Sequence, residues 1–141
     1  MAQVAAEATA RAVSARYDNR PDALIEILHA LQAELGHVPS ATIPELAKAL
    51  NLSRAEVHGV VTFYHDFRSE PAGRHVLKIC RAEACQSMGG EALAAHAEDR
   101  AGVPGGGTSA AGRVTLEPVY CLGLCACAPA AMLDSVPVGR L

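Results

Sequence analysis

The first half of the chain carries apolar residues at a helical period. Five of them occur at i, i+3, i+4, i+7 and i+11, and they are Leu24, Ile27, Leu28, Leu31 and Leu35. Pro21 precedes this run and Gly36 follows it, which is a common arrangement at the two ends of a helix. The pattern therefore predicts one helix with an apolar face between these two residues.

Two further helices are indicated by the spacing of capping boxes. Thr42 precedes Glu45, and Ser53 precedes Glu56, by the interval at which a hydroxyl side chain and a glutamate cap each other. Apolar residues follow both pairs, as expected for helices with one buried face. Residues 1–70 are therefore predicted to form a bundle of three to four short helices.

The second half has a different pattern, which begins after the linker-like segment RSEPAGRH. Short apolar runs now alternate with one helical stretch and one glycine-rich connection. The predicted order is strand, helix, strand, strand, in the segments HVLKIC, GGEALAAHAEDR, RVTLEPVYC and AAMLDSVPV. Residues 71–141 are thus expected to form a small α/β domain, and the chain as a whole an α+β protein.

The charge and composition argue against binding to nucleic acid. The formal net charge is −3, aromatic residues make up 4% of the chain, and there is no tryptophan to stack on bases. LAKALNLSRAEVHGVVTFY has the short turn of a helix-turn-helix, and a redox-sensing regulator is the alternative that it raises. Its second helix offers only Arg54 as a cation in the first turn, so no nucleic-acid partner is expected.

The chain shows no pattern for export or for a membrane. Residues 1–20 lack a basic start followed by an apolar run, and no apolar run approaches the ~20 residues that span a bilayer. A cytoplasmic protein with no direct membrane contact is expected. In such a reducing compartment, clustered cysteines bind metal more often than they form disulfides.

Four of the five cysteines form two pairs. Cys80 and Cys85 have C-x4-C spacing, and Cys121 and Cys125 have C-x3-C spacing. Both pairs follow a predicted strand, so we expect the four thiols at one end of one sheet. Cys127 lies two residues beyond the second pair and is the surplus cysteine.

These cysteines alone permit four interpretations. A structural zinc site accepts four thiolates, although the cysteines of its usual loops are closer together in sequence and have more polar neighbours. A dithiol oxidoreductase would need C-x2-C, which the chain lacks, and buried core thiols are the plainest alternative. An iron-sulfur cluster needs four thiolates, small residues and an apolar cover, a description that the neighbouring glycines and alanines match.

The order of the motifs resembles that of the thioredoxin-like [2Fe-2S] ferredoxins. CRAEAC, then a gap, then CLGLCACAP is similar to the C-x4-C and C-L-G-x-C-x-x-x-P signature of that family. The helical half, with GVVTFYHDF, looks like the 24-kDa-type subunit of NADH:quinone oxidoreductase, which has relatives in NAD-reducing hydrogenases. The phrase CRAEACQSMGG looks closest to the gamma subunit of soluble NAD-dependent molybdenum formate dehydrogenases.

The resemblance implies a thioredoxin-like domain with one [2Fe-2S] cluster. Its four ligands fall on Cys80, Cys85, Cys121 and Cys125, and Cys127 falls where the family varies. The implied function is one-electron transfer beside the flavin of a partner subunit that also binds NAD, within a complex that has a further iron-sulfur or molybdenum subunit. The chain would be an electron-transfer subunit that is not catalytic alone.

Other residues acquire expectations from this resemblance. Arg81, next to a cysteine ligand, is expected to offset part of the cluster's negative charge. The aromatic residues Phe63, Tyr64 and Phe67 belong either to the helical core or to a surface that docks the flavoprotein.

Overall fold

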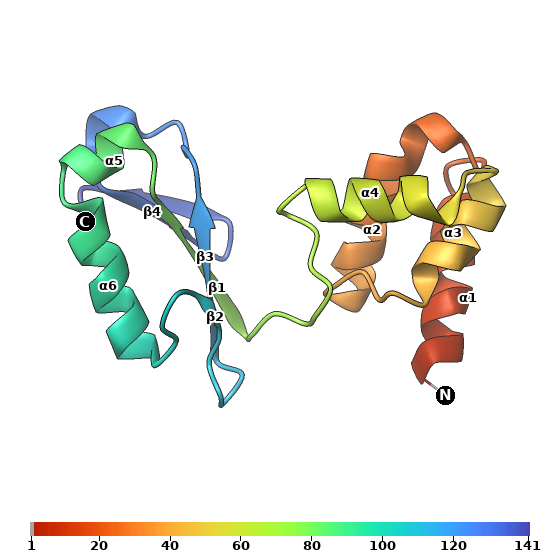
Figure 1. The fold of residues 1–141 in the computed structure, drawn as a ribbon, viewed down its shortest axis with the longest axis horizontal. Helices are drawn as coiled ribbons and strands as arrows, with labels where there is room; N and C mark the ends of the chain where they lie inside the picture. Colours follow the sequence, from red (N-terminus) through yellow and green to blue (C-terminus); the bar gives the residue numbers. More distant parts are fainter. Residues whose placement is uncertain (1) are drawn as a thin grey trace. The chain divides into compact units, whose positions relative to one another are not determined.

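The computed structural model describes residues 2–141, and the chain divides into two compact units, residues 1–71 and 72–141 (Figure 1). The first unit is helical. Its elements are α1 (Ala2–Ala15), a short 3₁₀ turn (Pro21–Ala23), α2 (Leu24–Leu35), α3 (Thr42–Leu50) and α4 (Arg54–Phe63). The second unit contains every described strand.

Helix α2 begins and ends where the apolar pattern predicted. Gly36 follows it with φ 78°, a left-handed conformation that glycine adopts without strain, and its N–H donates to the carbonyl of Gln32. The helix buries its apolar face completely at Ile27, Leu28 and Leu31. The predicted apolar stripe is therefore confirmed.

The two predicted capping boxes have different outcomes. At α4 the box is complete, because the Glu56 N–H donates to Ser53 Oγ and the Glu56 carboxylate accepts from the Ser53 N–H. At α3 the predicted box is wrong. Thr42 is already inside the helix and its hydroxyl donates to the carbonyl of Pro39 at 2.6 Å. The Thr42 side chain thus stabilises the turn before α3 and does not cap the helix.

Helix α1 was not predicted as an element of its own. Its buried positions carry small side chains, Ala6, Ala10, Val13 and Ser14, so the apolar period is weak. The helix nevertheless packs on α2 and α3 and completes a four-helix unit.

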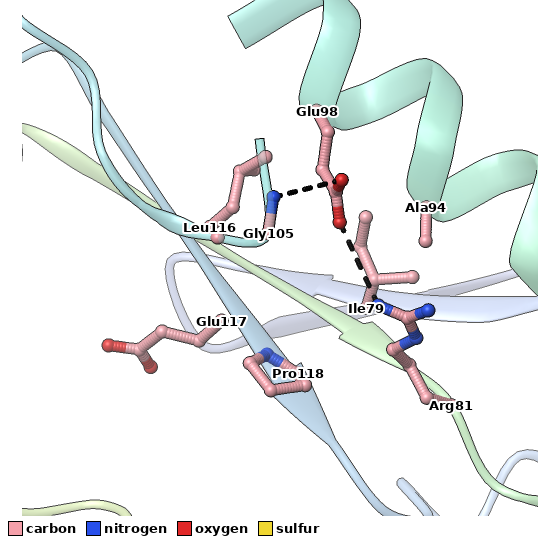
Figure 2. A pocket seen from close by; sticks show the side chains of 9 residues that line it. Ile79, Arg81, Ala94, Glu98, Gly105, Leu116, Glu117 and Pro118 are labelled. Atoms are coloured by element: carbon pink, nitrogen blue, oxygen red, sulfur yellow. Dashed lines mark hydrogen bonds and ion pairs between the residues drawn. The ribbon is translucent and has the colours of Figure 1, made fainter. Parts of the chain in front are cut away.

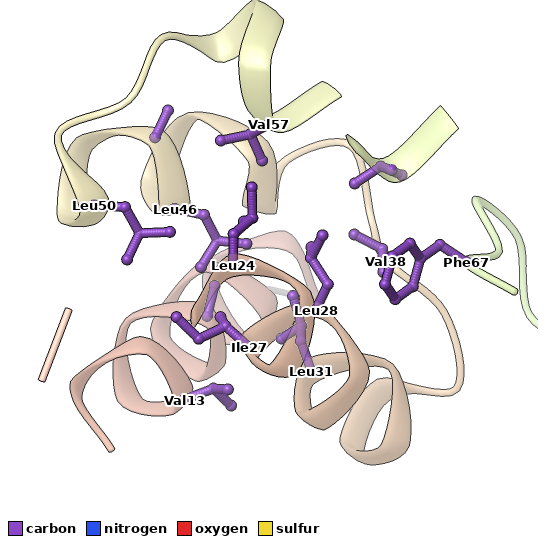
Figure 3. Close-up of a cluster of buried hydrophobic side chains, with 13 residues drawn as sticks. Val13, Leu24, Ile27, Leu28, Leu31, Val38, Leu46, Leu50, Val57 and Phe67 are labelled. Atoms are coloured by element: carbon purple, nitrogen blue, oxygen red, sulfur yellow. The ribbon is translucent and has the colours of Figure 1, made fainter. Parts of the chain in front are cut away.

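A single apolar core stabilises the helical unit (Figure 3). Each fully buried aliphatic side chain contributes roughly 1.5–3 kcal/mol relative to an exposed one. The labelled core residues are Val13, Leu24, Ile27, Leu28, Leu31, Val38, Leu46, Leu50, Val57 and Phe67. The unit therefore has its own hydrophobic core.

The second unit is a five-stranded sheet in the order β2-β3-β1-β4-β5. The strands are β1 (His75–Cys80), β2 (Gly107–Thr108), β3 (Val114–Val119), β4 (Ala130–Leu133) and β5 (Val136–Gly139). Strands β1 and β3 are parallel, and the other pairs are antiparallel. The helices are α5 (Glu83–Ser87) and α6 (Gly90–Ala101), followed later by a 3₁₀ turn (Cys125–Cys127). The expected α+β class is confirmed.

Helix α6 covers one face of the sheet. Ala94 is buried against Ile79 and Ala131, with Leu77, Leu93 and Ala97 packed around them. Small side chains on the helix let it lie close to the central strand. This contact fixes the helix beside the end of β1, where the first cysteine lies.

The predicted single strand at the end of the chain is a hairpin. Strands β4 and β5 are joined by Asp134 and Ser135, both at positive φ (47° and 71°). Two positive φ values are the requirement of the tight turn that suits two twisted antiparallel strands. The sequence between them lacks the glycine that most clearly signals such a turn.

Asp134 also ties this hairpin to the first residues of β1. Its carboxylate contacts His75 Nδ1 at 2.6 Å and accepts from the Val76 N–H at 2.8 Å. The hydrogen bond with His75 holds the pKa of Asp134 below its ordinary value, and the Val76 N–H acts in the same direction. The ionised carboxylate is therefore the form that the fold prefers.

We expect Asp134→Asn to lower the free energy of unfolding at pH 7 and to have little effect on it in acid. A carboxylate with a lowered folded pKa contributes stability above its unfolded pKa, about 3.9, and loses that contribution as the pH falls through the folded value. Denaturant unfolding of both proteins across acidic and neutral pH measures the difference. Asparagine tolerates positive φ, so the variant isolates the charge. If the difference in free energy of unfolding between the two proteins stays constant from neutral to acidic pH, this account is contradicted.

Within residues 2–141, none of the helices is both long and apolar enough to cross a membrane.

Candidate metal centre

The parallel pairing of β1 with β3 brings the two cysteine loops to one end of the sheet. Cys80 is the last residue of β1 and lies opposite Val119, the last residue of β3. The Arg81 N–H donates to the Val119 carbonyl at 2.8 Å, so the loops leave the sheet side by side. Cys121 follows two residues after β3. The topology thus explains why two pairs so far apart in sequence meet.

The first pair is buried. Cys80 and Cys85 are 3% and 2% exposed and form a small apolar cluster with Ala130. The short helix α5 turns the chain back so that Cys85 lies beside the strand end. Partly buried apolar residues complete the cover, and they are Ala82, Val119, Leu122, Leu124 and Ala128.

Gly90 allows α6 to start directly behind Cys85. A Cβ at this position would lie 2.6 Å from the Cys85 carbonyl oxygen and 2.9 Å from its carbon. No side chain fits there without a shift of the Cys85 backbone. The glycine is therefore part of the frame that places the first pair.

The second pair lies nearer the surface. Cys121 and Cys125 are exposed, and their sulfur atoms are 3.6 Å apart. Cys121 has φ 80°, which is uncommon for a residue with a side chain and costs of order 1–3 kcal/mol. Gly123, also at positive φ, donates its N–H to Cys121 Sγ at 3.3 Å. The loop thus turns a backbone donor toward a sulfur acceptor.

The Cys80 sulfur accepts hydrogen bonds from both loops. Burial acts to raise the pKa of this thiol, but donation from the Ala82 N–H and the Cys85 thiol lowers it. The N–H groups of Cys121 and Leu122 act in the same direction, and the resulting pKa of Cys80 lies below its ordinary value. Backbone donors from both loops therefore favour a thiolate at Cys80.

The other thiols influence one another strongly. Burial, followed by the hydrogen bond with Cys80, raises the pKa of Cys85. The hydrogen bond with Cys121 and the charge of that residue raise the pKa of Cys125, and the charges of Cys85 and Cys80 add to the effect. All four sulfurs therefore form one electrostatic group, which would be stable as thiolates only around compensating positive charge.

The donor set fits an iron-sulfur cluster. Four thiolates without a carboxylate or imidazole select soft metals, and backbone N–H groups with small apolar neighbours suit a cluster that has bridging sulfides. Across residues 2–141, no three His, Cys, Asp or Glu side chains are grouped to hold one metal ion. The choice between one metal ion and a cluster therefore rests on the donors and their surroundings.

Cys127 is held by a different part of the fold. It ends the 3₁₀ turn that begins at Cys125, and its carbonyl accepts from the Arg140 N–H at 2.6 Å. A Cβ at Gly139 would lie 2.7 Å from the Cys127 Cβ, so this cysteine packs tightly against β5. The backbone at Cys127 is thus held beside the end of β5, which is an edge strand of the sheet.

A sheet that carries two pairs of cysteines at one end, in loops that leave it side by side, is the arrangement expected of a thioredoxin-like iron-sulfur protein. The chain matches the family described as thioredoxin-like [2Fe-2S] ferredoxin over residues 10–141. It belongs to that family. The predictions of the family, of the thioredoxin-like fold and of one [2Fe-2S] cluster are confirmed.

The chain is also similar to subunits of NAD-linked complexes. It is 38% identical over 118 residues to a NADH-quinone oxidoreductase subunit of Pseudomonas aeruginosa, covering 84% of this chain and 71% of the relative. It is 40% identical to a NADH-quinone oxidoreductase subunit of Rhizobium meliloti, covering 84% of this chain and 70% of that relative. Both relatives are subunits of NADH-quinone oxidoreductases, so the chain is similar to the electron-transfer subunits of such complexes.

Among solved structures, the chain resembles one chain of an NAD+-reducing [NiFe]-hydrogenase in the air-oxidized state. The TM-score is 0.71 and the sequence identity 27%, over 84% of this chain and 20% of the hydrogenase chain. The present chain thus spans about a fifth of the length of that hydrogenase chain. The assignment of the individual cysteine ligands and of a formate dehydrogenase host stay predictions.

Several residues of the site could not be recognised from the sequence. The N–H groups that donate to Cys80 come from ordinary positions, Ala82 and Leu122, whose side chains carry no signal. Gly89 and Gly90 are recognisable as small residues, but the close approach of Gly90 to Cys85 depends on how α6 packs. Such contacts depend on tertiary structure.

Proposed function

We propose that the chain is the [2Fe-2S] subunit of a soluble, cytoplasmic NAD-dependent formate dehydrogenase. It would hold its cluster next to the flavin of the NAD-binding subunit, in a complex with a further iron-sulfur or molybdenum subunit. The observation that carries this proposal is that the pairing of β1 with β3 brings two cysteine loops to one end of the sheet, with Cys80 and Cys85 buried and Cys121 and Cys125 at the surface. The formate host rests on the similarity of CRAEACQSMGG alone.

The four cysteines would hold the cluster, which when bound takes up and releases one electron. The chain's own contribution is to stabilise negative charge there. N–H groups at Ala82, Cys121 and Leu122 donate to Cys80, and Gly123 donates to Cys121. The buried pair excludes water from one side, while Cys121 and Cys125 face the surface, which suits electron exchange with a partner.

A second candidate host follows from the relatives. Similarity to the NADH-quinone oxidoreductase subunits favours a complex that passes electrons from NADH to a quinone. The hydrogenase similarity favours one that uses H₂. All three hosts would use the same flavin-linked electron step, so they differ in the remaining subunits.

The helical unit, residues 1–70 in the sequence prediction, would dock the flavoprotein. The three aromatic residues there have different environments: Phe67 is buried in the core, while Phe63 is 72% and Tyr64 42% exposed. The rings of Phe63 and Tyr64 contact edge to face at 5.0 Å, beside a surface hollow that other apolar side chains of this unit help to line. Exposed aromatic anchors of this kind are favoured at protein interfaces.

Purification of the tagged chain from its own cells tests the proposal. We expect a flavoprotein and a molybdenum subunit to co-purify, and formate as well as NADH to reduce the cluster, as followed by electron paramagnetic resonance. Phe63→Ser should reduce the recovered flavoprotein several-fold, while Val4→Ser, an equally exposed apolar position in α1, should not.

Different outcomes separate the parts of the proposal. Reduction by NADH but not by formate, with quinone-reductase or hydrogenase subunits recovered, would exclude the formate host. A colourless chain without iron would exclude the carrier function itself. Equal recovery with Phe63→Ser would exclude the docking role of this surface.

A further inference from the structure

Arg81 is paired with two carboxylates of α6. The guanidinium lies 2.7 Å from Glu91 Oε2 through Nη2, and 3.7 Å from Glu98 Oε1 through Nη1. Figure 2 shows the Arg81 side chain reaching toward Glu98 on the helix. The Arg81 cation, which the sequence analysis expected to offset part of the cluster's negative charge, is thus itself paired with two negative charges of α6.

Glu98 joins three parts of the unit. Its second carboxylate oxygen accepts from the Gly105 N–H at 3.0 Å, and its backbone carbonyl accepts from the Val103 N–H at 3.0 Å. Both contacts hold the glycine-rich loop, and the dashed lines in Figure 2 mark the side-chain contacts to Gly105 and Arg81. The Glu98 side chain is only 26% exposed, so its charge is partly shielded from solvent.

The loop held by Glu98 rests on the sheet. A Cβ at Gly106 would come within 3.2 Å of the Leu116 carbonyl oxygen, and Gly107 pairs with Leu116, so the loop lies close beside β3 where it enters β2. Arg81 is fixed at its other end by the N–H that donates to Val119. The ion pairs therefore connect the helix, the glycine-rich loop and the first cysteine loop.

The electrostatic consequence concerns Cys80, the residue before Arg81. Arginine and glutamate side chains are charged at neutral pH, so the Arg81 guanidinium faces two carboxylates at Glu91 and Glu98. Summed over the three side chains the formal charge is negative. Negative charge near the cysteine ligands makes it harder for the cluster to take up an electron, and positive charge nearby makes it easier.

We propose that Glu98 is a positioning residue which, together with Glu91, holds the Arg81 guanidinium against α6 and offsets its charge, and so lowers the reduction potential of the cluster electrostatically. This inference rests on the proposed function, since it requires a cluster on Cys80. Neither glutamate belongs to the cysteine motifs. Electron uptake itself forms and breaks no bond in this network.

Redox titration of the full-length protein, followed by visible absorption, tests the proposal. Arg81→Gln and Glu98→Gln break the same ion pair but change the local charge in opposite directions. We expect a lower potential for Arg81→Gln, a higher one for Glu98→Gln, and a value near that of the unaltered protein for Glu98→Asp. Glu45→Gln is the matched control, because it removes the Glu45–Arg11 pair (2.7 Å) in the helical unit.

The direction of the shifts decides the outcome. If both substitutions move the potential the same way, the ion network acts through geometry, and if neither moves it, the network does not tune the potential; either result overturns the proposal. Should Glu98→Gln lose the cluster, Glu91→Gln provides the same test, with a higher potential expected and an unchanged one overturning the idea. If the unaltered protein binds no cluster, the proposed function has failed instead.

Discussion

Cys121→Ala should yield a colourless protein, whereas Cys127→Ala should keep the visible spectrum of the unaltered chain. The Cys121 sulfur lies 3.6 Å from that of Cys125 and interacts electrostatically with it, so the substitution removes one of the four proposed ligands. Iron and sulfide analysis of freshly purified protein, together with the absorption spectrum, measures the effect. We expect iron close to background for Cys121→Ala.

The Cys127 variant is the matched control for this experiment. Alanine keeps the Cβ that packs against Gly139 and removes only the sulfur atom. Full iron content therefore distinguishes a bystander from a ligand. Loss of iron in Cys127→Ala with retention in Cys121→Ala would reverse the ligand assignment for the second loop.

Gly90→Ala should destabilise the second unit and lower its iron content. The new Cβ would lie 2.6 Å from the Cys85 carbonyl oxygen, and overpacking of this kind typically costs about 1–3 kcal/mol. Relief requires a shift of the Cys85 backbone, which also displaces the thiol. Denaturant unfolding and iron analysis of the same preparation measure both effects.

Gly59→Ala is the control for this experiment, because the same substitution at this position should stabilise the chain. Gly59 lies inside α4, and a Cβ there would meet nothing within 4 Å. Alanine is favoured over glycine in a helix by roughly 0.5–1 kcal/mol, so this variant should unfold at slightly higher denaturant concentration. If Gly90→Ala were equally harmless, the tight frame around Cys85 would not limit the site.

Local patterns predicted those elements whose residues act locally. The Ser53–Glu56 box and the apolar face of α2 depend on residues within one or two turns, and both are present. Helix α1 escaped prediction because its buried face is mostly alanine. The Thr42 box failed because a hydroxyl in the first turn also finds a backbone acceptor, here Pro39, just before the helix.

The candidate site was predictable in its residue types and less so in its environment. The spacing of the two cysteine pairs and their positions at strand ends placed four thiols together, and the parallel pairing of β1 with β3 brings them there. The two carboxylates at Arg81 could not be predicted, because Glu91 and Glu98 reach it only when α6 packs on the sheet. Donors such as the Leu122 N–H belong to the backbone and have no sequence signature.

The parallel pairing of β1 with β3 also affects how such a site is assembled. Cys80 and Cys121 lie at the ends of two adjacent strands that hydrogen-bond along their length, so the long connection between them is closed by the sheet. The entropy of that loop closure is lost when the strands pair, not when iron binds. Pairing of the two strands therefore brings the two cysteine loops together, and a cluster bound there would need to order only the short turns between the cysteines.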